Sequence, residues 1–238
     1  MGKPALTFNS RLFVFDEDFA LNLSEDIQGW TISDSPNITG QPADSKTFVD
    51  QTMQAYSETL SPGRMYYGTK SKVLADRSEA YVMAIVQSGN RRYCRGGRTG
   101  WVGVPTTVPN EDSIESGITF LRTAPWMRGM VAVPFFFMSG ALSVDVGSFS
   151  KTDVAYLIVT EKTGTPATAA ITLATTGAGS ASKITSFSRP SGKPVDLSGF
   201  GTTNSNAKLT ITDPGASNSV QGWLVIGQPY TLPDRVEV

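Results

Sequence analysis

The stretch Thr119–Gly147, TFLRTAPWMRGMVAVPFFFMSGALSVDVG, decides the fold class of this chain. It contains two apolar runs, Met130–Met138 and Ala141–Val146, which are separated only by Ser139-Gly140. Short runs that are rich in Val and Phe and bounded by Gly and Pro are typical of buried strands rather than of helices. A compact turn, Trp126-Met127-Arg128-Gly129, precedes the first run. The stretch therefore predicts a turn followed by two buried strands.

The composition of the whole chain agrees with this interpretation. The 238 residues are enough for one large β domain or two small ones. Only 17% of the residues are charged, while 23 Gly and 14 Pro accompany abundant Ser and Thr. Such a mixture favours short strands joined by turns over helices, which need more Glu, Lys, Leu and Ala. The sequence predicts an all-β chain.

The order of patterns along the chain divides it into two parts. Residues 1–70 are rich in turn residues, which predicts a largely irregular N-terminal arm with one first short strand, Arg11–Phe15. We expect this arm to become ordered against neighbouring subunits. Residues 71–238 form the rest of a single β-sandwich domain with long loops. About eight antiparallel strands have the spacing of a sandwich or barrel. The expected strands include Tyr81–Val86, Trp101–Val104, Met130–Met138, Leu142–Val146, Val154–Thr160, Ala169–Ala174 and Gln221–Gly227.

Several absences narrow the classes of function. The chain has no histidine, which excludes Ser-His-Asp and Cys-His catalysis and histidine metal ligation. Cys94 is the only cysteine, so an internal disulfide cannot form, and we interpret it as a packing residue. The net charge is −1, and no apolar window is long enough for a transmembrane helix. With no phosphate loop, dinucleotide fingerprint or calcium loop, we expect no cofactor, no metal ion, no membrane contact and no small-molecule substrate.

The opening stretch resembles capsid proteins of picornavirus-like small RNA viruses, most closely those of insect and marine-algal members. The resemblance lies in Phe120-Leu121, Trp126, Arg128-Gly129, the run Met130–Met138 and Ser139-Gly140. It implies a jelly-roll β-sandwich in which Trp126, Arg128 and Gly129 form the fold-determining turn. It also implies a structural protein of the virion, a capsid subunit assembled in the host cytoplasm. Its partners would be copies of itself or sister capsid proteins, in an icosahedral shell enclosing single-stranded RNA.

One acidic motif is the candidate for chemistry. Asp16-Glu17-Asp18-Phe19 follows the first expected strand, and Glu17-Asp18-Phe19 is similar to an Asp-Asp-Phe motif of picorna-like insect viruses. That resemblance implies a role for Glu17 and Asp18 in a capsid-maturation cleavage, since paired carboxylates can share a proton and activate water. The alternative is a solvated acidic turn after a strand. We expect the second reading, and therefore no enzyme.

Four arginines form the candidate for nucleic-acid binding. Arg91, Arg92, Arg95 and Arg98 occur within eight residues of a glycine-containing segment that we interpret as a loop. Guanidinium groups bind phosphates, and the neighbouring aromatic residues can stack on unpaired bases, so the cluster suits weak, salt-sensitive contact with packaged RNA. The alternative is an interface in which these arginines pair with acidic residues across a subunit boundary.

A second function also fits the sequence. A phage tail or fibre protein, or a carbohydrate-binding β-sandwich, would share the all-β composition. In the carbohydrate-binding version, exposed Trp30, Trp101, Trp126 and Trp223 stack on sugar rings, whereas in the structural version at least two of them pack in a core.

Overall fold

The structure, a computed structural model, divides the chain into two compact units. It describes residues 10–27, 29–42, 49–62, 65–66, 68–88, 91–104, 115–138, 143–163, 171–175, 182–184, 189–211 and 218–229. The first unit comprises Met1–Ser24, Ala80–Gly97 and Met127–Pro229, and the second comprises Glu25–Glu79, Arg98–Trp126 and Tyr230–Val238. Almost all of the second unit is therefore inserted between strands of the first. The prediction of an all-β chain is confirmed, because the described ranges contain antiparallel sheets and a single short helix.

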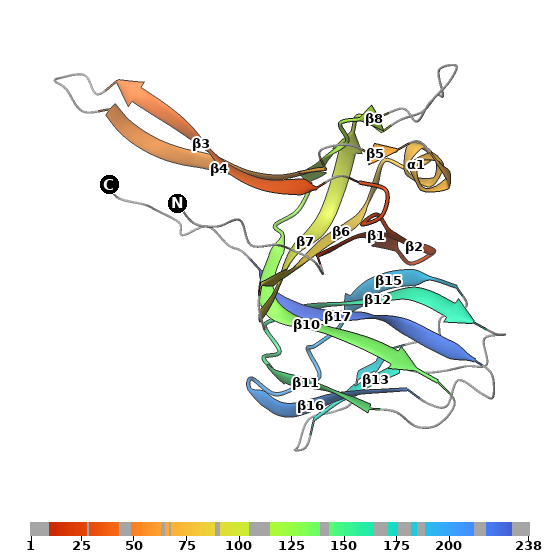
Figure 1. Cartoon of the computed structure of the whole chain (residues 1–238). Helices are drawn as coiled ribbons and strands as arrows, with labels where there is room; N and C mark the ends of the chain where they lie inside the picture. The colour runs from red at the N-terminus through yellow and green to blue at the C-terminus, as the bar shows by residue number, and fades with distance from the viewer. Residues whose placement is uncertain are drawn as a thin grey trace. The chain divides into compact units, whose positions relative to one another are not determined.

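The strands of the first unit form two antiparallel sheets (Figure 1). One sheet has the order β15-β12-β17-β10-β7-β6-β1-β2, and the other has the order β11-β16-β13-β14. The bounds are β1 Arg11–Asp16, β2 Phe19–Asn22, β6 Glu79–Ser88, β7 Arg91–Val102, β10 Met127–Phe137, β11 Ser143–Phe149, β12 Val154–Thr163, β13 Ile171–Ala174, β14 Ser182–Ile184, β15 Ser191–Val195, β16 Asn204–Ile211 and β17 Ser219–Pro229.

The last eight of these strands pair in a nested pattern. β10 pairs with β17, β11 with β16, β12 with β15, and β13 with β14, and every pair is antiparallel. The additional pairs β12–β17 and β13–β16 join the nested pairs into two four-stranded layers. The segment from β10 to β17 is thus one long hairpin, folded over itself so that successive strands change layer except β13 and β14, which lie in the same layer.

A sheet that is apolar on both faces separates two hydrophobic cores in the first unit. The core between the two sheets, here called the sandwich core, contains Phe135, Phe137, Leu157 and Leu224. The core on the other face, here called the barrel core, contains intervening residues of β10, β12 and β17 together with residues of β1, β6 and β7. Its members are Phe13, Phe15, Met83, Ile85, Cys94, Met127, Ala132, Tyr156, Ile158 and Val225. Successive strand residues point to opposite faces, so a strand between two cores must be apolar at every position.

The larger sheet rolls into a nearly closed barrel. β15, at one end of the strand order, contacts β1 and β2 at the other end. Gly192 on β15 makes this closure fit, because a Cβ there would lie 2.4 Å from a carbon of the Phe15 ring. Phe15 stacks on Tyr81 and meets Tyr156 edge-on, with ring centroids 5.6 and 5.9 Å apart. Aromatic packing across the seam therefore fills the barrel core.

The decisive stretch of sequence forms β9, β10 and β11, with one difference from the prediction. Met127, Arg128 and Gly129 do not form a turn, since they already belong to β10 and pair with β17 and β7. A bulge between Arg128 and Val131 replaces the expected turn. Gly129 is needed beside it, because a Cβ there would lie 2.2 Å from the Ile226 carbonyl oxygen. Ser139-Gly140 lies outside the described residues.

The predicted burial of the first apolar run is only partly correct. Phe135 and Phe137 are buried in the sandwich core, but Met130, Phe136 and Met138 are 64, 53 and 52% exposed. β7 pairs with β10 only as far as Gly129, so the described remainder of β10 has β17 as its one paired neighbour. Beyond this point Phe135 and Phe137 face the sandwich core, while Met130 and Phe136 on the opposite face are exposed.

The second unit contains the elements that the sequence predicted as an irregular arm. Its strands are β3 Trp30–Pro42, β4 Val49–Pro62, β5 Met65–Tyr66, β8 Glu115–Ser116 and β9 Thr119–Arg122, and its helix is α1 Thr69–Ala75. The end of β7, from Arg98, belongs to it as well. The prediction for residues 1–70 differs from the structure because the described part of that segment is mostly strand. Its Ser, Thr and Pro residues resemble turn residues but lie in a two-stranded ribbon.

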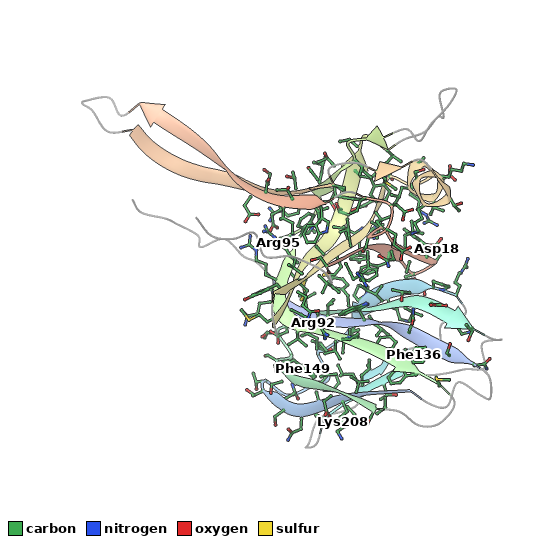
Figure 2. The ribbon with its side chains drawn as sticks, in the orientation of Figure 1. Asp18, Arg92, Arg95, Phe136, Phe149 and Lys208 are labelled. Atoms are coloured by element: carbon green, nitrogen blue, oxygen red, sulfur yellow. The ribbon has the colours of Figure 1, made fainter. Side chains whose placement is uncertain are left out.

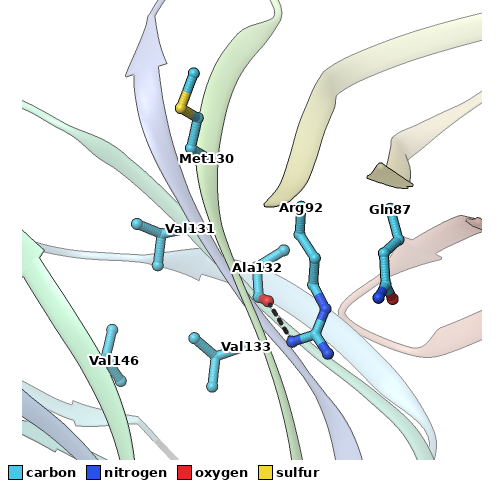
Figure 3. Close-up of a pocket in the computed structure, with 7 residues that line it drawn as sticks. All are labelled: Gln87, Arg92, Met130, Val131, Ala132, Val133 and Val146. Carbon is cyan, nitrogen blue, oxygen red and sulfur yellow. Dashed lines mark hydrogen bonds between the residues drawn. The ribbon is translucent and has the colours of Figure 1, made fainter. Parts of the chain in front are cut away.

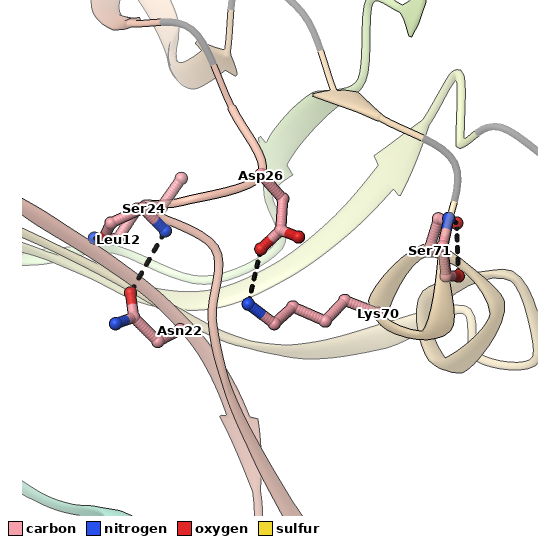
Figure 4. Close-up of polar contacts among 7 residues, drawn as sticks. Leu12, Asn22, Ser24, Asp26, Lys70 and Ser71 are labelled. Atoms are coloured by element: carbon pink, nitrogen blue, oxygen red, sulfur yellow. Dashed lines mark hydrogen bonds and ion pairs between the residues drawn. The ribbon is translucent and has the colours of Figure 1, made fainter. Parts of the chain in front are cut away.

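The helix α1 is held by two polar contacts (Figure 4). The Ser71 hydroxyl accepts a hydrogen bond from the Gly68 N–H and donates one to the Gly68 carbonyl, which caps the first turn. Lys70 forms an ion pair with Asp26. In the first unit, the Ser24 hydroxyl accepts a hydrogen bond from the Leu12 N–H, which fixes the chain directly after β2. These contacts secure the ends of elements that are too short to be stable alone.

Truncation of Leu157 tests the role of the shared sheet. Leu157 is fully buried in the sandwich core. We expect Leu157→Ala to lower the free energy of unfolding by about 2–5 kcal/mol, because the cavity is enclosed by strands on all sides. Chemical denaturation measures this, and Lys151→Ala in the exposed turn before β12 is the control, expected to change stability by less than about 0.5 kcal/mol. A loss equal to that of the control would contradict the two-core arrangement.

The barrel core predicts a loss of stability at alkaline pH. Burial raises the pKa of Cys94 from 9.0 to about 12 and that of Tyr156 from 10.0 to about 12. Both groups stay neutral in the folded state while they ionise in the unfolded state, so unfolding releases protons between about pH 9 and pH 12. Stability is complete below this window and falls within it, by at most about 1.4 kcal/mol per pH unit for each group.

Unfolding measured from pH 7 to pH 11 checks this pH dependence. Tyr156→Phe removes the tyrosine part and should flatten the profile above pH 10. An unchanged slope in the variant would show that Tyr156 is not the responsible group.

Candidate assembly interface

The longest paired element of the second unit is the hairpin of β3 and β4, here called the ribbon and drawn in orange in Figure 1. The two strands have 13 and 14 residues, and their register runs from Trp30 opposite Pro62 to Pro42 opposite Val49. One irregularity interrupts it, between Asn37 and Ile38. A ribbon of this length extends for about 40 Å at 3.3 Å per residue.

The ribbon has open edges along most of its length. β4 pairs with β9 only at its base, where Thr59 and Leu60 lie opposite Leu121 and Phe120. Within the described residues β3 pairs with no strand other than β4. Among the described strands, only β9 pairs with an outer edge of the ribbon, at Thr59 and Leu60 of β4. An isolated two-stranded hairpin is marginally stable in water, and open edges are templates for pairing with another chain.

The register of the ribbon separates two kinds of residue pair. Alternate cross-strand pairs belong to opposite faces of a ribbon. One set consists of small, mostly hydroxyl-bearing or amide residues: Thr31–Ser61, Ser33–Thr59, Ser35–Ser57 and Asn37–Ala55. The other set is mainly apolar with one acidic pair: Ile32–Leu60, Asp34–Glu58, Pro36–Tyr56 and Ile38–Met53. The backbone register thus gives the ribbon a polar and an apolar face.

A buried ion pair fixes the base of the ribbon. Glu58 of β4 is fully buried, and its carboxylate lies 3.2 Å from Nη1 of Arg122, whose side chain is 18% exposed. The same carboxylate oxygen accepts a hydrogen bond of 3.4 Å from the backbone N–H of Trp126. The Trp126 ring is buried and donates from Nε1 to the Arg98 carbonyl at 3.1 Å. Strands β4, β7 and β9 are thereby locked where the ribbon begins.

The four arginines lie on a strand rather than in the predicted loop. Residues 91–98 belong to β7. Because successive side chains of a strand point to opposite faces, Arg92 and Arg95 lie on opposite faces of β7 (Figure 2). Arg92 lies over the Trp223 ring, 5.6 Å from its centroid, and donates a hydrogen bond to the Ala132 carbonyl at 3.4 Å (Figure 3). A guanidinium held over an aromatic face in this way is a cation–π contact. Arg92 therefore contributes to packing within the first unit.

The remaining arginines do not complete a continuous patch. Arg98 belongs to the second unit, where its Nε lies 3.1 Å from the Glu79 carboxylate. The hydrogen bond that Arg98 donates to Glu79, together with one from the Thr123 hydroxyl, lowers the pKa of Glu79. Arg95 is half-buried and lies in the first unit, and the side chain of Arg91 lies outside the described residues. The structure thus divides the predicted cluster between the two units, and one of its members already has a carboxylate partner.

A pocket of about 390 Å³ lies beside Arg92 in the first unit (Figure 3). It occurs where β10 has left β7, and Met130, Val131, Val133 and Val146 line it together with Arg92 and Gln87. The lining is mostly aliphatic, and Arg92 contributes its one charge, already directed at the Ala132 carbonyl and Trp223. This arrangement offers no nucleophile or acid–base pair and is a packing irregularity along an open strand edge.

The acidic motif lies at the tight turn between β1 and β2. Asp16 and Phe19 are cross-strand partners, which leaves Glu17 and Asp18 as the two turn residues, and both are exposed. The Asp16 carboxylate accepts a hydrogen bond of 2.9 Å from the Glu17 N–H, a contact that stabilises the turn. The geometry is that of a solvated hairpin turn. The role of Glu17 and Asp18 in a capsid-maturation cleavage stays a prediction.

The tryptophans and acidic residues give no sign of a ligand site. Trp126 is buried, and Trp30, Trp101 and Trp223 are half-buried. The Trp101 indole donates to the Leu74 carbonyl at 3.1 Å and packs edge-on against Phe120. Among the described residues, no cluster of three or more acidic or cysteine side chains is placed to hold a metal ion. No helix in the same part of the chain is long and apolar enough to cross a membrane.

Comparisons with known proteins do not assign the chain to a family. No protein-family model and no curated protein matches the sequence. Among solved structures, the comparison found the Dit protein (gp 19.1) of phage SPP1, titled as a paradigm of the hub adsorption apparatus in phages that infect Gram-positive bacteria. The sequence identity is 8%, the match covers 91% of this chain and 99% of that chain, and the TM-score is 0.27. A likeness at this level carries no argument about fold or function.

Removal of the buried charge partner tests the base of the ribbon. Arg122→Met leaves the Glu58 carboxylate without its guanidinium, so we expect a loss of about 3 kcal/mol in unfolding free energy. Adding Glu58→Gln to that variant should recover part of the loss, because the amide carries no charge to desolvate. Chemical denaturation followed by tryptophan fluorescence measures both steps. Equal stability of the wild type and Arg122→Met would contradict this account of the base.

Proposed function

We propose that this chain is a structural subunit that assembles with copies of itself, or with sister subunits, into a virus particle: an icosahedral shell that encloses RNA. The observation that carries the proposal is the ribbon, whose open edges and two-faced register need a partner that a single copy does not supply. A catalytic or ligand-binding function has no comparable support, because the candidate residues for chemistry are exposed turn residues or packing groups.

The nested pairing of β10 to β17 supports a jelly roll as the fold of the sandwich. A jelly roll contains eight antiparallel strands in two four-stranded sheets and is used by viral capsid and lectin domains. The orders β15-β12-β17-β10 and β11-β16-β13-β14 satisfy this description. Because one fold supports many functions, the jelly roll supports the capsid proposal only together with the ribbon.

A phage tail or fibre subunit is the second candidate function. The ribbon favours it for a specific reason: repeated head-to-tail contacts between copies form a ring when the rotation closes, and a tail is built around one axis. The carbohydrate-binding alternative is less well supported, because each described tryptophan ring is buried or half-buried.

Contact with packaged RNA remains a separate proposal within the capsid function. Arg95 and Arg91 are its remaining candidates, since Arg92 packs on Trp223 and Arg98 pairs with Glu79. Assembly in the host cytoplasm and residence in the virion follow from the same proposal.

Shortening the ribbon tests the proposed function. We expect the full chain to form large assemblies, visible by negative-stain microscopy and light scattering. A variant in which an Asn-Gly turn joins Ser35 directly to Ser57 keeps the closing cross-strand pair but removes most of the β4 edge that β9 does not occupy, so it should stay monomeric. Lys208→Ala, at an exposed position of the first unit, is the control and should assemble normally. A full chain that stays monomeric at all concentrations would overturn the proposal.

A further inference from the structure

We propose that the ribbons of several copies pair edge to edge, β3 of one copy with β4 of the next, and close into a ring whose centre is a β-barrel. The inference rests on the proposed self-assembly and names its mode. It follows from three features of the ribbon: which edges are open, how the strands alternate, and how the two faces differ in composition.

The two long edges of the ribbon, one formed by β3 and the other by β4, decide the symmetry of pairing between copies. Pairing between like strands, β3 with β3 or β4 with β4, is two-fold symmetric, and each such contact leaves the other edge of both ribbons open. Pairing of β3 with β4 is heterologous, and repeated heterologous contacts form a closed ring when the rotation closes. Only a closed barrel removes every edge. Neither strand of the ribbon contains Lys, the charged residue that most commonly protects an edge, although Asp34, Pro36 and Asp50 lie on it.

The directions of β3 and β4 also favour pairing of unlike strands around a rotation axis. β3 and β4 are antiparallel, so ribbons related by rotation about an axis along their length present an alternating up-and-down order. The contact between β3 of one copy and β4 of the next is then also antiparallel. All ribbons point the same way, and the same hydrogen-bond pattern continues around the ring. A two-fold contact would instead direct the two ribbons in opposite directions.

The two faces of the ribbon indicate how many copies the ring contains. A closed barrel has an inner and an outer face, and the register gives the ribbon one small, polar set of pairs and one largely apolar set. A barrel of about eight strands has an interior just filled by side chains, and wider barrels hold a water-filled channel. The hydroxyl-bearing set fits a wet lumen, which favours a ring of more than about four copies. Leu60 and Glu58 of the apolar set are already buried within one copy, which places this set on the side away from the lumen.

Pro36 and the irregularity near Asn37 limit where pairing is continuous. Proline lacks the N–H that a ladder needs, and a bulge shifts the strand register. Trp30–Ser35 is therefore the longest uninterrupted stretch of β3, and within it Ser33 is exposed. Ser57, on β4, belongs to the same polar set and is also exposed. These two positions are suitable for a test.

Cross-linking between two single-cysteine proteins tests the ring. Cys94→Ser removes the one native thiol from both proteins, and one protein then carries Ser33→Cys while the other carries Ser57→Cys. No copy carries both, so an intramolecular bond cannot form. The two are mixed, assembled and treated with a bis-maleimide that spans less than two strand spacings, about 9.5 Å, so that only thiols on adjacent strands are joined. Pairing holds the two thiols at an effective concentration in the millimolar range, so the mixture should yield at least about ten times more covalent dimer than either protein alone.

Each outcome of this experiment decides something. Ser205→Cys, exposed on the first unit, is mixed with the Ser57→Cys protein as a control and should give only background. Dimer from the Ser33→Cys protein alone would indicate two-fold pairing and overturn the ring. Assemblies without mixed dimers would overturn the ring and leave the proposed function intact. Failure of properly folded protein to assemble, with circular dichroism as the check on folding, would overturn both.

Discussion

The first unit depends on one constraint: a single sheet must satisfy hydrophobic cores on both of its faces. β12 shows this directly, because Leu157 and Val159 face the sandwich core while Tyr156 and Ile158 face the barrel core. Strands β10, β12 and β17 of the shared layer therefore contribute to both interiors, and neither interior can lose its packing without loosening the other. The close approach of backbone at Gly129 and of an aromatic ring at Gly192 belongs to the same constraint, since a layer covered twice has no free side toward which to shift.

This constraint also explains what the sequence could predict about the fold. The runs Val154–Thr160 and Gln221–Gly227 are apolar at nearly every position, and both were recognisable as strands because a doubly covered strand has no polar side. Because polar and apolar residues do not alternate along these strands, the sequence did not indicate how many layers of sheet the unit contains. The turn expected at Trp126–Gly129 was wrong, because a glycine beside a β-bulge and a glycine in a turn have the same local sequence. Tertiary pairing with β17, far along the chain, decides between them.

The candidate interface was the least predictable part. The segment 30–62 contains the alternation of a strand, with Ile32 opposite Leu60, but its Ser, Thr, Asn and Pro residues are also typical of turns. A ribbon without a core lacks the apolar runs that identify a strand, so composition alone indicates an irregular arm. The arginines show the opposite difficulty. Four like residues close in sequence predicted one patch, whereas strand alternation and a change of unit between Gly97 and Arg98 separate them.

The insertion of the second unit between strands of the first has a consequence for biosynthesis. The ribosome makes Arg11–Asp16 well before β15, and although Tyr81 and Tyr156 pack on Phe15 earlier, its ring is fully covered only when Gly192 arrives. At about 5–20 residues per second, that wait is on the order of tens of seconds. The inserted segments meanwhile include partners close in sequence, such as the two strands of the ribbon, and can pair while the barrel is still open. During that time a nascent chain carries an aromatic strand without all of its partners, so we expect β1 to be a segment to which chaperones bind.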